Sequence, residues 1–405
     1  MAGAKEGEAV RYLREDVLAH GPAHKARVEA ALGKAGLKSL DDLAKVPPIS
    51  LADVADPASV VLRPPAPKGT SSKAERTRRT LELSYKPVHW IVQDGVPLGS
   101  SEMDLRRLAN IGARWLARCG VVSDDVVLGL LPAGPRLPYW ELVLGTRQLA
   151  VASVHLPPVP SDADMARLRP SVVVGRPSDL VRLLDTAGRG SDNTAWRARV
   201  RLVIVAGEPL EDGLRTRLQS RLEAPGAAVV SAWAPSGARA LWWECQGGTG
   251  MHTWPEAELV QVVDPLSGTP VPPGADGEVV WTAVGWHGSV LMRLRTGVFA
   301  ALDPTACPSC GEPGPRLDVI PTAPGYLEVL DRHRGVAGWQ AELRTVNGRE
   351  ELLVFLALSG RAGLERLLVD LDAHLSATQY VVLEKADLER RLAAHDDRRL
   401  VDLRA

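Results

Sequence analysis

Aromatic side chains are scarce in this sequence, apart from tryptophan. The 405 residues include only 2 Phe and 5 Tyr, against 11 Trp, and 45% of the chain is hydrophobic. Leu, Val and Ala must therefore build most of the core. The chain is too long for one compact core, so we expect one large domain and a small one.

An excess of charge of either sign is also missing. The chain carries 48 Lys and Arg against 49 Asp and Glu, a formal net charge of −1. This balance argues against general attraction to nucleic acid or to an anionic membrane. The longest apolar runs, such as residues 126–132, are too short to cross a bilayer. The first residues carry charges where a signal peptide needs an apolar segment, so we expect a cytoplasmic protein.

Cysteine is rare as well, and four residues of this type do not suggest a disulfide framework. Three of them fall in two short segments, Cys245-x6-His252 and Cys307-x2-Cys310. A CxxC pair in a Pro/Gly turn can present two thiolates to one tetrahedral ion, and the glycines between Cys245 and His252 let that pair close on the same ion. The pattern predicts a structural Zn²⁺ site, because four protein ligands leave no open position.

Other interpretations of these residues stay open. Cys245 and His252 are core residues in one of them, and the CxxC segment is then a plain turn. A disulfide between Cys307 and Cys310 is a further alternative. Asp303 and His287 are spare ligand candidates.

Hydrophobic periodicity predicts an α/β body. Residues 8–46 indicate two short amphipathic helices, and the Pro-rich, then basic, residues 60–80 indicate a loop. Further on, apolar strands at residues 126–132, 172–175 and 200–207 alternate with helices at 104–118 and 210–222. Strands that are apolar throughout and separated by helices favour a parallel sheet covered on both faces.

The pattern changes towards the C-terminus. Residues 255–302 read as a small β subdomain, with an antiparallel hairpin and a further strand at 289–295, and residues 303–315 read as a turn that carries zinc ligands. Residues 351–358 and 380–388 read as strands and 361–375 as a helix, which together make a small α+β domain. We place the two domains at residues 1–328 and 329–405.

Several segments together resemble the phenylacetate–CoA ligase branch of the adenylate-forming ligase superfamily. They are the entry helices at residues 24–54, the loop and helix AGEPLEDGLRTRL at 206–218, the Cys…His segment and hairpin at 244–282, RLRTG at 293–297, CPSCG at 307–311 and the terminal RRLVDLR at 398–404. The resemblance implies the family's fold of a large α/β domain and a small C-terminal one. It also implies the same Cys and His pairing around zinc.

The resemblance implies a particular chemistry, the joining of a carboxylic acid to AMP and then to the thiol of coenzyme A. That chemistry needs a glycine-rich loop around the phosphates, a glutamate for Mg²⁺, an aspartate for the ribose and a lysine near the C-terminus. By the same resemblance, Gly207, Glu208, Pro209, Trp233, Ser236 and Arg295 occupy nucleotide-site positions, and Trp90, Tyr139 and Trp140 are candidates for an acyl pocket.

The chain departs from the family at the phosphate loop. Residues 80–90 read TLELSYKPVHW, and only Ser84, Lys86 and Pro87 remain recognisable. The glycines that allow close backbone approach to a phosphate are gone. Gly99-Ser100-Ser101 falls after the expected strand rather than in it, so we do not expect a relocated loop.

Three other catalytic positions are also changed. Gly237 stands where the glutamate is expected, and Val298 stands where the aspartate is expected. Asp397 or Arg398 stands near the position of the lysine. A valine cannot accept a hydrogen bond from the ribose, and the loss of such a partner costs about 1–3 kcal/mol.

These departures favour a protein that lacks ATP-dependent adenylation and binds a ligand or a partner. Its ligand would be a small carboxylic acid or an acyl group, or its partner another protein; we expect no nucleic acid and no membrane. The departures argue against ATP with Mg²⁺ as cofactors, and coenzyme A is not assigned. The alternative is an active AMP-forming acyl-CoA ligase with non-standard ATP contacts. A third reading, thioester handling without ATP, finds no nucleophile in the sequence.

Overall fold

The chain forms an α/β structure with two compact units. The computed structural model describes residues 2–54, 56–157, 160–186, 196–207, 209–210, 212–222, 224, 226–320, 330, 333, 335–346, 349–359, 364–372, 377–395 and 399–403. The first unit consists of Met1–Arg118, Ala133–Leu149 and Ala234–Ile320. The second consists of Cys119–Pro132, Ala150–Trp233 and Pro321–Ala405.

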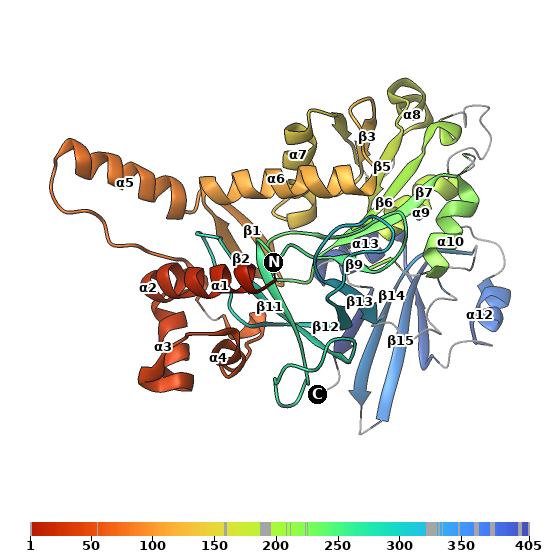
Figure 1. Ribbon diagram of the computed structural model, residues 1–405. Coiled ribbons are helices and arrows are strands. Elements are labelled where there is room, and N and C mark those ends of the chain that lie inside the picture. The colour runs from red at the N-terminus through yellow and green to blue at the C-terminus, as the bar shows by residue number, and fades with distance from the viewer. Residues whose placement is uncertain are drawn as a thin grey trace. The chain divides into compact units, whose positions relative to one another are not determined.

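The first unit begins with short helices. They are α1 (Ala2–Tyr12), η1 (Leu13–Val17), α2 (Leu18–His20), α3 (Pro22–Leu32), η2 (Gly33–Ala35), α4 (Leu40–Ala44), η3 (Leu51–Asp53) and η4 (Pro57–Val60), drawn in red and orange in Figure 1. Ser39 caps α4, because its hydroxyl accepts a hydrogen bond from the Asp42 amide at 3.2 Å. The predicted helical entry segment is therefore confirmed.

One sequence-based prediction in this region is wrong. Residues 60–80 were expected to form a loop, but α5 (Ser72–Tyr85) occupies the second half of that range. The Ser71 hydroxyl caps the helix by accepting a bond from the Ala74 amide at 3.2 Å, and the following Lys, Arg, Glu and Leu residues are good helix formers. The predicted loop fits only the Pro-rich segment that leads into the helix.

The strands β1 (His89–Gln93) and β2 (Val96–Ser100) form a hairpin after α5. Gly99 and Ser100 lie in β2, so the expectation that they follow the strand is wrong. Two long helices come next in this unit, α6 (Glu102–Cys119) and α7 (Leu137–Leu149). A Cβ on Gly145 would lie 2.6 Å from the carbonyl carbon of Gly112, so only glycines permit this contact between the helices.

The first unit also holds an antiparallel sheet in the order β10-β11-β12-β13-β9-β8. These strands are β8 (Trp242–Glu244), β9 (Met251–His252), β10 (Glu258–Val263), β11 (Asp276–Ala283), β12 (Leu294–Asp303) and β13 (Arg316–Ile320). The predicted hairpin corresponds to β10 and β11. The strand expected at 289–295 begins only at Leu294, because Arg293 has a left-handed backbone with φ +53° that interrupts extended geometry.

The second unit contains a parallel sheet in the order β7-β6-β5-β3-β4. Its strands are β3 (Val126–Gly129), β4 (Ala152–His155), β5 (Val172–Gly175), β6 (Leu202–Ala206) and β7 (Ala228–Trp233). The helical segments of this part are α8 (Asp162–Leu168), α9 (Pro177–Thr186), η5 (Arg197–Arg199) and α10 (Asp212–Arg221). All residues of β5 and β6 are buried, as the continuous apolar runs predict for a sheet covered on both faces.

A small mixed sheet completes the second unit, in the order β16-β15-β14-β17. Its elements are β14 (Val336–Val346), β15 (Arg349–Leu358), α12 (Leu364–Asp372), β16 (Gln379–Val382), α13 (Lys385–Ala394) and β17 (Leu400–Leu403). The strand expected at 380–388 is wrong in its second half, where α13 begins and buries Leu388 and Leu392 at helical spacing. The domain boundary predicted at residue 328 lies outside the described residues.

Across the described ranges, we find no helix that combines the length and the apolar character needed to cross a membrane. The buried core of the first unit is rich in tryptophan, with Trp115, Trp242, Trp243, Trp281 and Trp286 among its largest fully buried side chains. Cys119 is also fully buried in the core.

Candidate functional site

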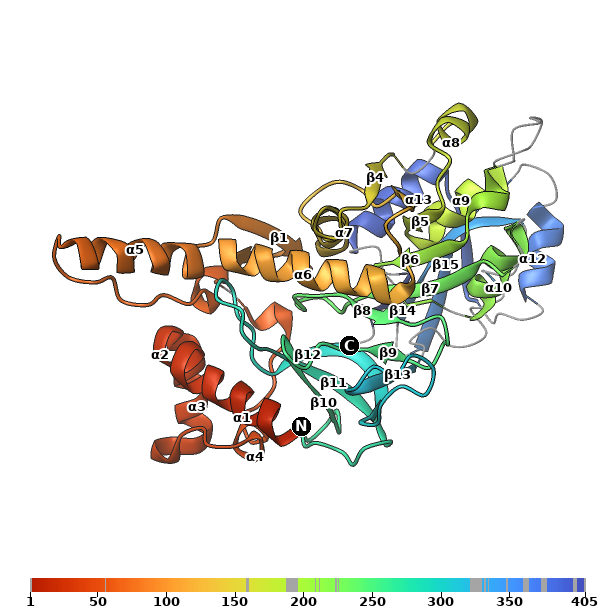
Figure 2. The ribbon, with the colours of Figure 1, turned by 45° about the horizontal axis from the view of Figure 1, so that its top comes forward.

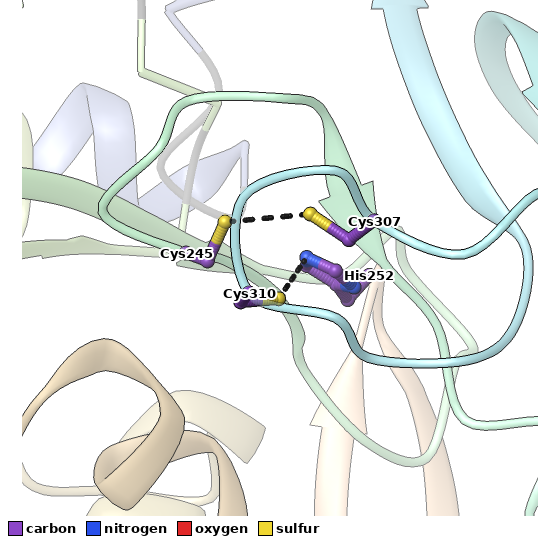
Figure 3. A group of neighbouring side chains, drawn as sticks. All are labelled: Cys245, His252, Cys307 and Cys310. Atoms are coloured by element: carbon purple, nitrogen blue, oxygen red, sulfur yellow. Dashed lines mark hydrogen bonds between the residues drawn. The ribbon is translucent and has the colours of Figure 1, made fainter.

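Three cysteines and one histidine of the first unit meet at one point (Figure 3). Cys245 follows β8, His252 ends β9, and Cys307 and Cys310 lie in the turn between β12 and β13. The ligand atoms of all four residues lie within 4.8 Å of one another. The structure thus brings together the four residues that the sequence pattern singled out as a metal site.

The distances within this group fit a tetrahedral ion. Cys245 Sγ lies 3.8 Å from Cys307 Sγ, and Cys310 Sγ lies 3.6 Å from His252 Nε2 (Figure 3). Zinc bonded to sulfur at about 2.3 Å and to nitrogen at about 2.05 Å separates two sulfurs by about 3.8 Å and a sulfur from a nitrogen by about 3.6 Å. A buried Cys₃His group of these dimensions can therefore bind a metal ion.

Glycines let the two ligand loops approach each other. Gly248 and Gly250 have φ of +63° and +94°, which other residues rarely adopt. A Cβ on Gly250 would lie 2.9 Å from the Leu317 carbonyl oxygen, and a Cβ on Gly247 would clash with Ser309. The sheet holds the loops in place, because His252 pairs with Trp243 on one side and with Arg316 on the other.

The pKa values within the group differ from one ligand to the next. Burial, followed by the charges of Arg316 and Arg118, lowers the pKa of His252 to about 4, so the imidazole is neutral at pH 7 as a ligand must be. Burial raises the pKa of the Cys307 thiol, but hydrogen bonds, foremost from the Thr249 hydroxyl, outweigh it and bring this pKa to about 6. Burial and the neighbouring thiols raise the pKa of Cys310 to about 11.

The surroundings of the group hold residues that the sequence analysis missed. Thr249 Oγ1 lies 3.0 Å from Cys307 Sγ, although the GGTG segment was read only as a flexible spacer. Arg316 is buried, donates to the Thr249 carbonyl at 2.7 Å and pairs with Asp303. No spacing in the sequence connects Arg316 with the cysteines; only the pairing of β13 with β9 does so.

Three further residues lie near the metal group or were candidates for it. Trp243 packs against the group, with its ring stacked on that of His252 at 4.1 Å between centroids and 13° between planes. The spare candidates Asp303 and His287 are not members of the group. Asp303 pairs with Arg316, while the His287 ring contacts Tyr85 at 5.0 Å between centroids.

The predicted nucleotide-site residues are divided between the two units. In the second unit, Gly207 and Trp233 lie at the carboxyl ends of the neighbouring parallel strands β6 and β7, where α/β sheets bind ligands. The Gly207 amide donates to the Ala232 carbonyl at 3.2 Å and its φ is +94°. Pro209 follows this turn, and Glu208 lies outside the described residues.

Ser236, Arg295 and Val298, which the resemblance compares with further nucleotide-site positions, lie in the first unit. The Arg295 guanidinium pairs with the buried Glu278 carboxylate across β11 and β12 and donates to the Pro265 carbonyl at 2.7 Å. Val298 is 9% exposed on β12. Asp397 and Arg398, compared above with the family's lysine, lie outside the described residues.

The segment at the phosphate-loop position is not a glycine-rich loop. Residues 80–85 are the last turns of α5, and β1 begins at His89. Further along, the amide of Gly237, the residue that the resemblance compares with the magnesium glutamate, donates to the side chain of Gln93 at 2.9 Å.

The acyl-pocket candidates do not all come together. Tyr139 and Trp140, both on α7, make an edge contact at 5.6 Å between centroids, and Trp140 makes another with His89 at 4.5 Å. Trp90 follows His89 in β1, so its side chain points to the opposite face of the hairpin. It is 42% exposed there.

Comparisons with known proteins agree with this architecture. No protein-family model matches the chain. A structure of 2-hydroxyisobutyryl-CoA ligase in the postadenylation state superimposes with a TM-score of 0.74 over 98% of this chain and 92% of that one, at 18% identity. The fold is therefore that of the adenylate-forming ligases.

Relatives in sequence narrow this class. The phenylacetate–coenzyme A ligase of Pseudomonas putida is 23% identical over 286 residues, which cover 66% of this chain and 59% of the relative. That of Thermus thermophilus is 24% identical over 313 residues, covering 72% and 63% respectively. The match thus spans about three fifths of each relative's length. This chain is a distant homologue of the phenylacetate–coenzyme A ligases.

Proposed function

We propose that this chain is an acyl-CoA ligase homologue that binds an acyl ligand or a protein partner without forming an adenylate from ATP. The observation that carries the proposal is that the segment compared with the family's phosphate loop contains no glycine and is helical up to Tyr85, while the Cys₃His group is complete. The ligand class is that of the relatives, a small carboxylic acid or its activated acyl group.

The residues compared with the family's phosphate loop, 80–90, support the proposal. A triphosphate is held by closely spaced backbone amides, which glycines present without steric hindrance. Here the matching residues are helical up to Tyr85 and contain no glycine. The amides in the interior of a helix already bond to carbonyls one turn earlier, so they are not available to a phosphate.

The residues at the positions compared with the ribose aspartate and the magnesium glutamate also support the proposal. Val298 offers only a hydrocarbon side chain where the ribose hydroxyls need an acceptor. Gly237 offers no carboxylate, and a Cβ at this position would overlap with Leu294. The space next to Gly237 is therefore filled by a leucine, and a longer acidic side chain would need that leucine to move.

A second candidate function is an active AMP-forming acyl-CoA ligase that uses displaced ATP contacts. The comparisons favour this candidate, because the relatives named above are ligases. Its remaining contacts would be Glu208, Ser236 and Arg295. The pairing of Arg295 with Glu278 weighs against it, since a nucleotide would have to compete with an ion pair already formed.

One assay separates the two candidates. Purified chain is mixed with ATP, Mg²⁺, labelled pyrophosphate and a panel of aromatic and aliphatic acids, and exchange of label into ATP is measured. We expect no exchange with any acid, while phenylacetate–coenzyme A ligase from Pseudomonas putida exchanges with phenylacetate as positive control. Robust exchange with any acid of the panel contradicts the proposal and supports the active ligase.

We further propose that the Cys₃His group holds a structural zinc ion. All four coordination positions are then taken by protein, so the ion takes no part in catalysis and joins the β8–β9 segment to the turn after β12. Three of the four ligands are buried, which favours retention of the ion. A cytoplasmic location and domains at 1–328 and 329–405 remain part of this proposal.

A further inference from the structure

A groove in the first unit lies between α5 and the segment that leads into it. Its cavity volume is about 540 Å³, and apolar side chains dominate its lining. Its lining includes the apolar floor residues Val61, Leu62, Leu81, Tyr85 and Trp90 and the half-buried Arg78, and at the solvent-exposed rim stand Arg63, Lys86 and one acid, Glu82. We call these nine residues the α5 groove.

Helix α5, which forms one side of the groove, is fixed to the helical entry segment at its C-terminal end. The Tyr85 hydroxyl donates to the Asp16 carboxylate at 2.6 Å, and the Tyr85 ring contacts His20 at 5.6 Å between centroids. Along the rest of the 14-residue helix, Ala74 alone is buried. In Figures 1 and 2 the segment before α5 doubles back along the helix, and Arg78 ties the two together by donating to the Gly69 carbonyl at 3.2 Å.

The charge around the groove is strongly one-sided. Residues 63–86 contain seven basic residues against two acidic ones, a surplus of five positive charges in a chain whose net charge is −1. Arg63 and Lys86 are exposed, and their side chains pair with no group in the described ranges. A groove with an apolar floor and unpaired cations at its rim is complementary to an apolar segment that carries carboxylates.

We propose that the α5 groove docks an acidic, amphipathic segment of a protein partner. The cavity of about 540 Å³ is bordered by residues of α5 and of the strand after it, from Arg78 to Trp90, and by the preceding segment, from Ala58 to Pro67. A small carboxylic acid would fill only part of this volume, whereas a peptide segment that runs along the helix can fill it and meet the cations of both Arg63 and Lys86.

A membrane or a nucleic acid fits the surface less well. The half-buried residues Arg78, Leu81 and Tyr85 share the inward side of α5 at helical spacing, so the helix offers no continuous apolar stripe on its outward side for insertion into lipid. Phosphates match the basic rim but not the apolar floor, and Trp90 is the only exposed aromatic ring in the groove.

The test uses a fluorescein-labelled peptide of Glu, Leu, Phe and Ala, about 14 residues long to match α5. Two companion peptides carry Gln or Lys in place of every Glu. Binding to the full chain is followed by fluorescence anisotropy. We expect saturable binding of the Glu peptide, weakened in salt of about 0.5 M because rim charges are exposed to solvent. The Gln peptide should bind on the order of tenfold more weakly.

Variants then locate the site. Arg63→Glu with Lys86→Glu should weaken the Glu peptide on the order of tenfold and create binding of the Lys peptide. Trp90→Ala should weaken binding at both salt concentrations. The control variant Lys34→Glu with Lys38→Glu changes the net charge by the same amount, on exposed residues that do not line the groove. It should leave peptide binding unchanged. All of these positions except Trp90 are exposed charges, so the fold is expected to persist, as circular dichroism would verify.

Several results overturn the proposal. They are no saturable binding, equal binding of all three peptides, and equal losses in the groove and control variants. Preferential binding of single-stranded RNA or of anionic phosphatidylserine vesicles would assign the surface to another class of partner. Displacement of the Glu peptide by phenylacetate would make the groove a small-acid site instead.

Discussion

The metal group and the positions compared with the nucleotide site differ in how many of the residues that each site requires are present. At the metal group, all four ligands are present, and the distances Cys245 Sγ–Cys307 Sγ and Cys310 Sγ–His252 Nε2 match a tetrahedral zinc ion. At the positions that the resemblance compares with the nucleotide site, the sequence has no glycine-rich loop, Gly237 and Val298 stand where carboxylates are expected, and Arg295 is paired within the protein. Because the two groups depend on different residues, a change at one does not require a change at the other.

Removal of the metal should give the largest effect and tests the retained side of this comparison. Zinc at a structural site contributes its binding free energy to folding, so Cys307→Ala or chelation should lower the free energy of unfolding by about 4–5 kcal/mol or more. Denaturant unfolding and the metal content of the purified chain provide the measurement. Cys119→Ala is the matched control, because Cys119 is buried away from the group and should leave the zinc in place.

If the chain purifies without zinc and a chelator leaves its stability unchanged, the proposed zinc site is contradicted. The group would then be a cluster of core residues, as one of the alternative interpretations of the sequence holds.

The second-largest effect is expected from Glu258, in the tryptophan-rich core of the first unit, on the pH dependence of stability. The Glu258 carboxylate accepts bonds from the Trp242 and Trp281 indoles at 2.9 and 2.5 Å and from the Trp254 amide at 2.8 Å. Burial outweighs these bonds and raises the pKa of Glu258 to about 7. Between pH 4.5 and 7 the folded chain therefore binds more protons than the unfolded chain, and this group's contribution to stability falls as the pH rises.

The size of this effect is on the order of 3 kcal/mol across that interval, at 1.36 kcal/mol per pKa unit. His24 and His252, whose burial lowers their pKa to about 4, act in the opposite direction below pH 6.5. The measurement is consequently the difference in unfolding free energy between the wild type and Glu258→Gln at several pH values. We expect that difference to decline from pH 5 to 7; parallel curves would show that Glu258 does not titrate there.

An acid placed at Val298, the position compared with the ribose aspartate, tests the nucleotide side of the comparison. Val298→Asp places a carboxylate at a site that is 9% exposed, so we expect a loss of about 2 kcal/mol in stability. Thermal unfolding with and without ATP and Mg²⁺ is the measurement. Rescue by the nucleotide would mean that the pocket is still shaped for it; we expect none. Val298→Asn serves as a control for size without charge.

The smallest effect is expected at Arg295. Arg295→Ala removes the partner of the buried Glu278, but the guanidinium side chain is 36% exposed and solvent screens the pair, so the loss should be about 1 kcal/mol. Arg295→Lys, which keeps the charge, should lose less. If Arg295→Ala instead leaves stability unchanged and abolishes a measurable affinity for ATP, the residue serves the nucleotide and not the sheet.

Sequence patterns predicted some elements well and others poorly. The continuous apolar runs of β5 and β6 fixed their type, because only strands buried on both faces need them. The basic residues of the segment 73–79 lie inside α5, although its polar composition predicted a loop, and the left-handed Arg293 interrupts the strand that apolar composition predicted. In both cases a local feature, the Ser71 cap or a backbone angle, decided the outcome.

The sequence by itself determined which side chains are available: three clustered cysteines with a histidine, and a valine where a carboxylate was expected. Only the tertiary structure decided what surrounds them, because Thr249, Arg316 and Trp243 reach the metal group through strand pairing and loop closure rather than through spacing along the chain. The same holds for the α5 groove, whose walls lie about 20 residues apart in sequence and face each other only in the folded chain.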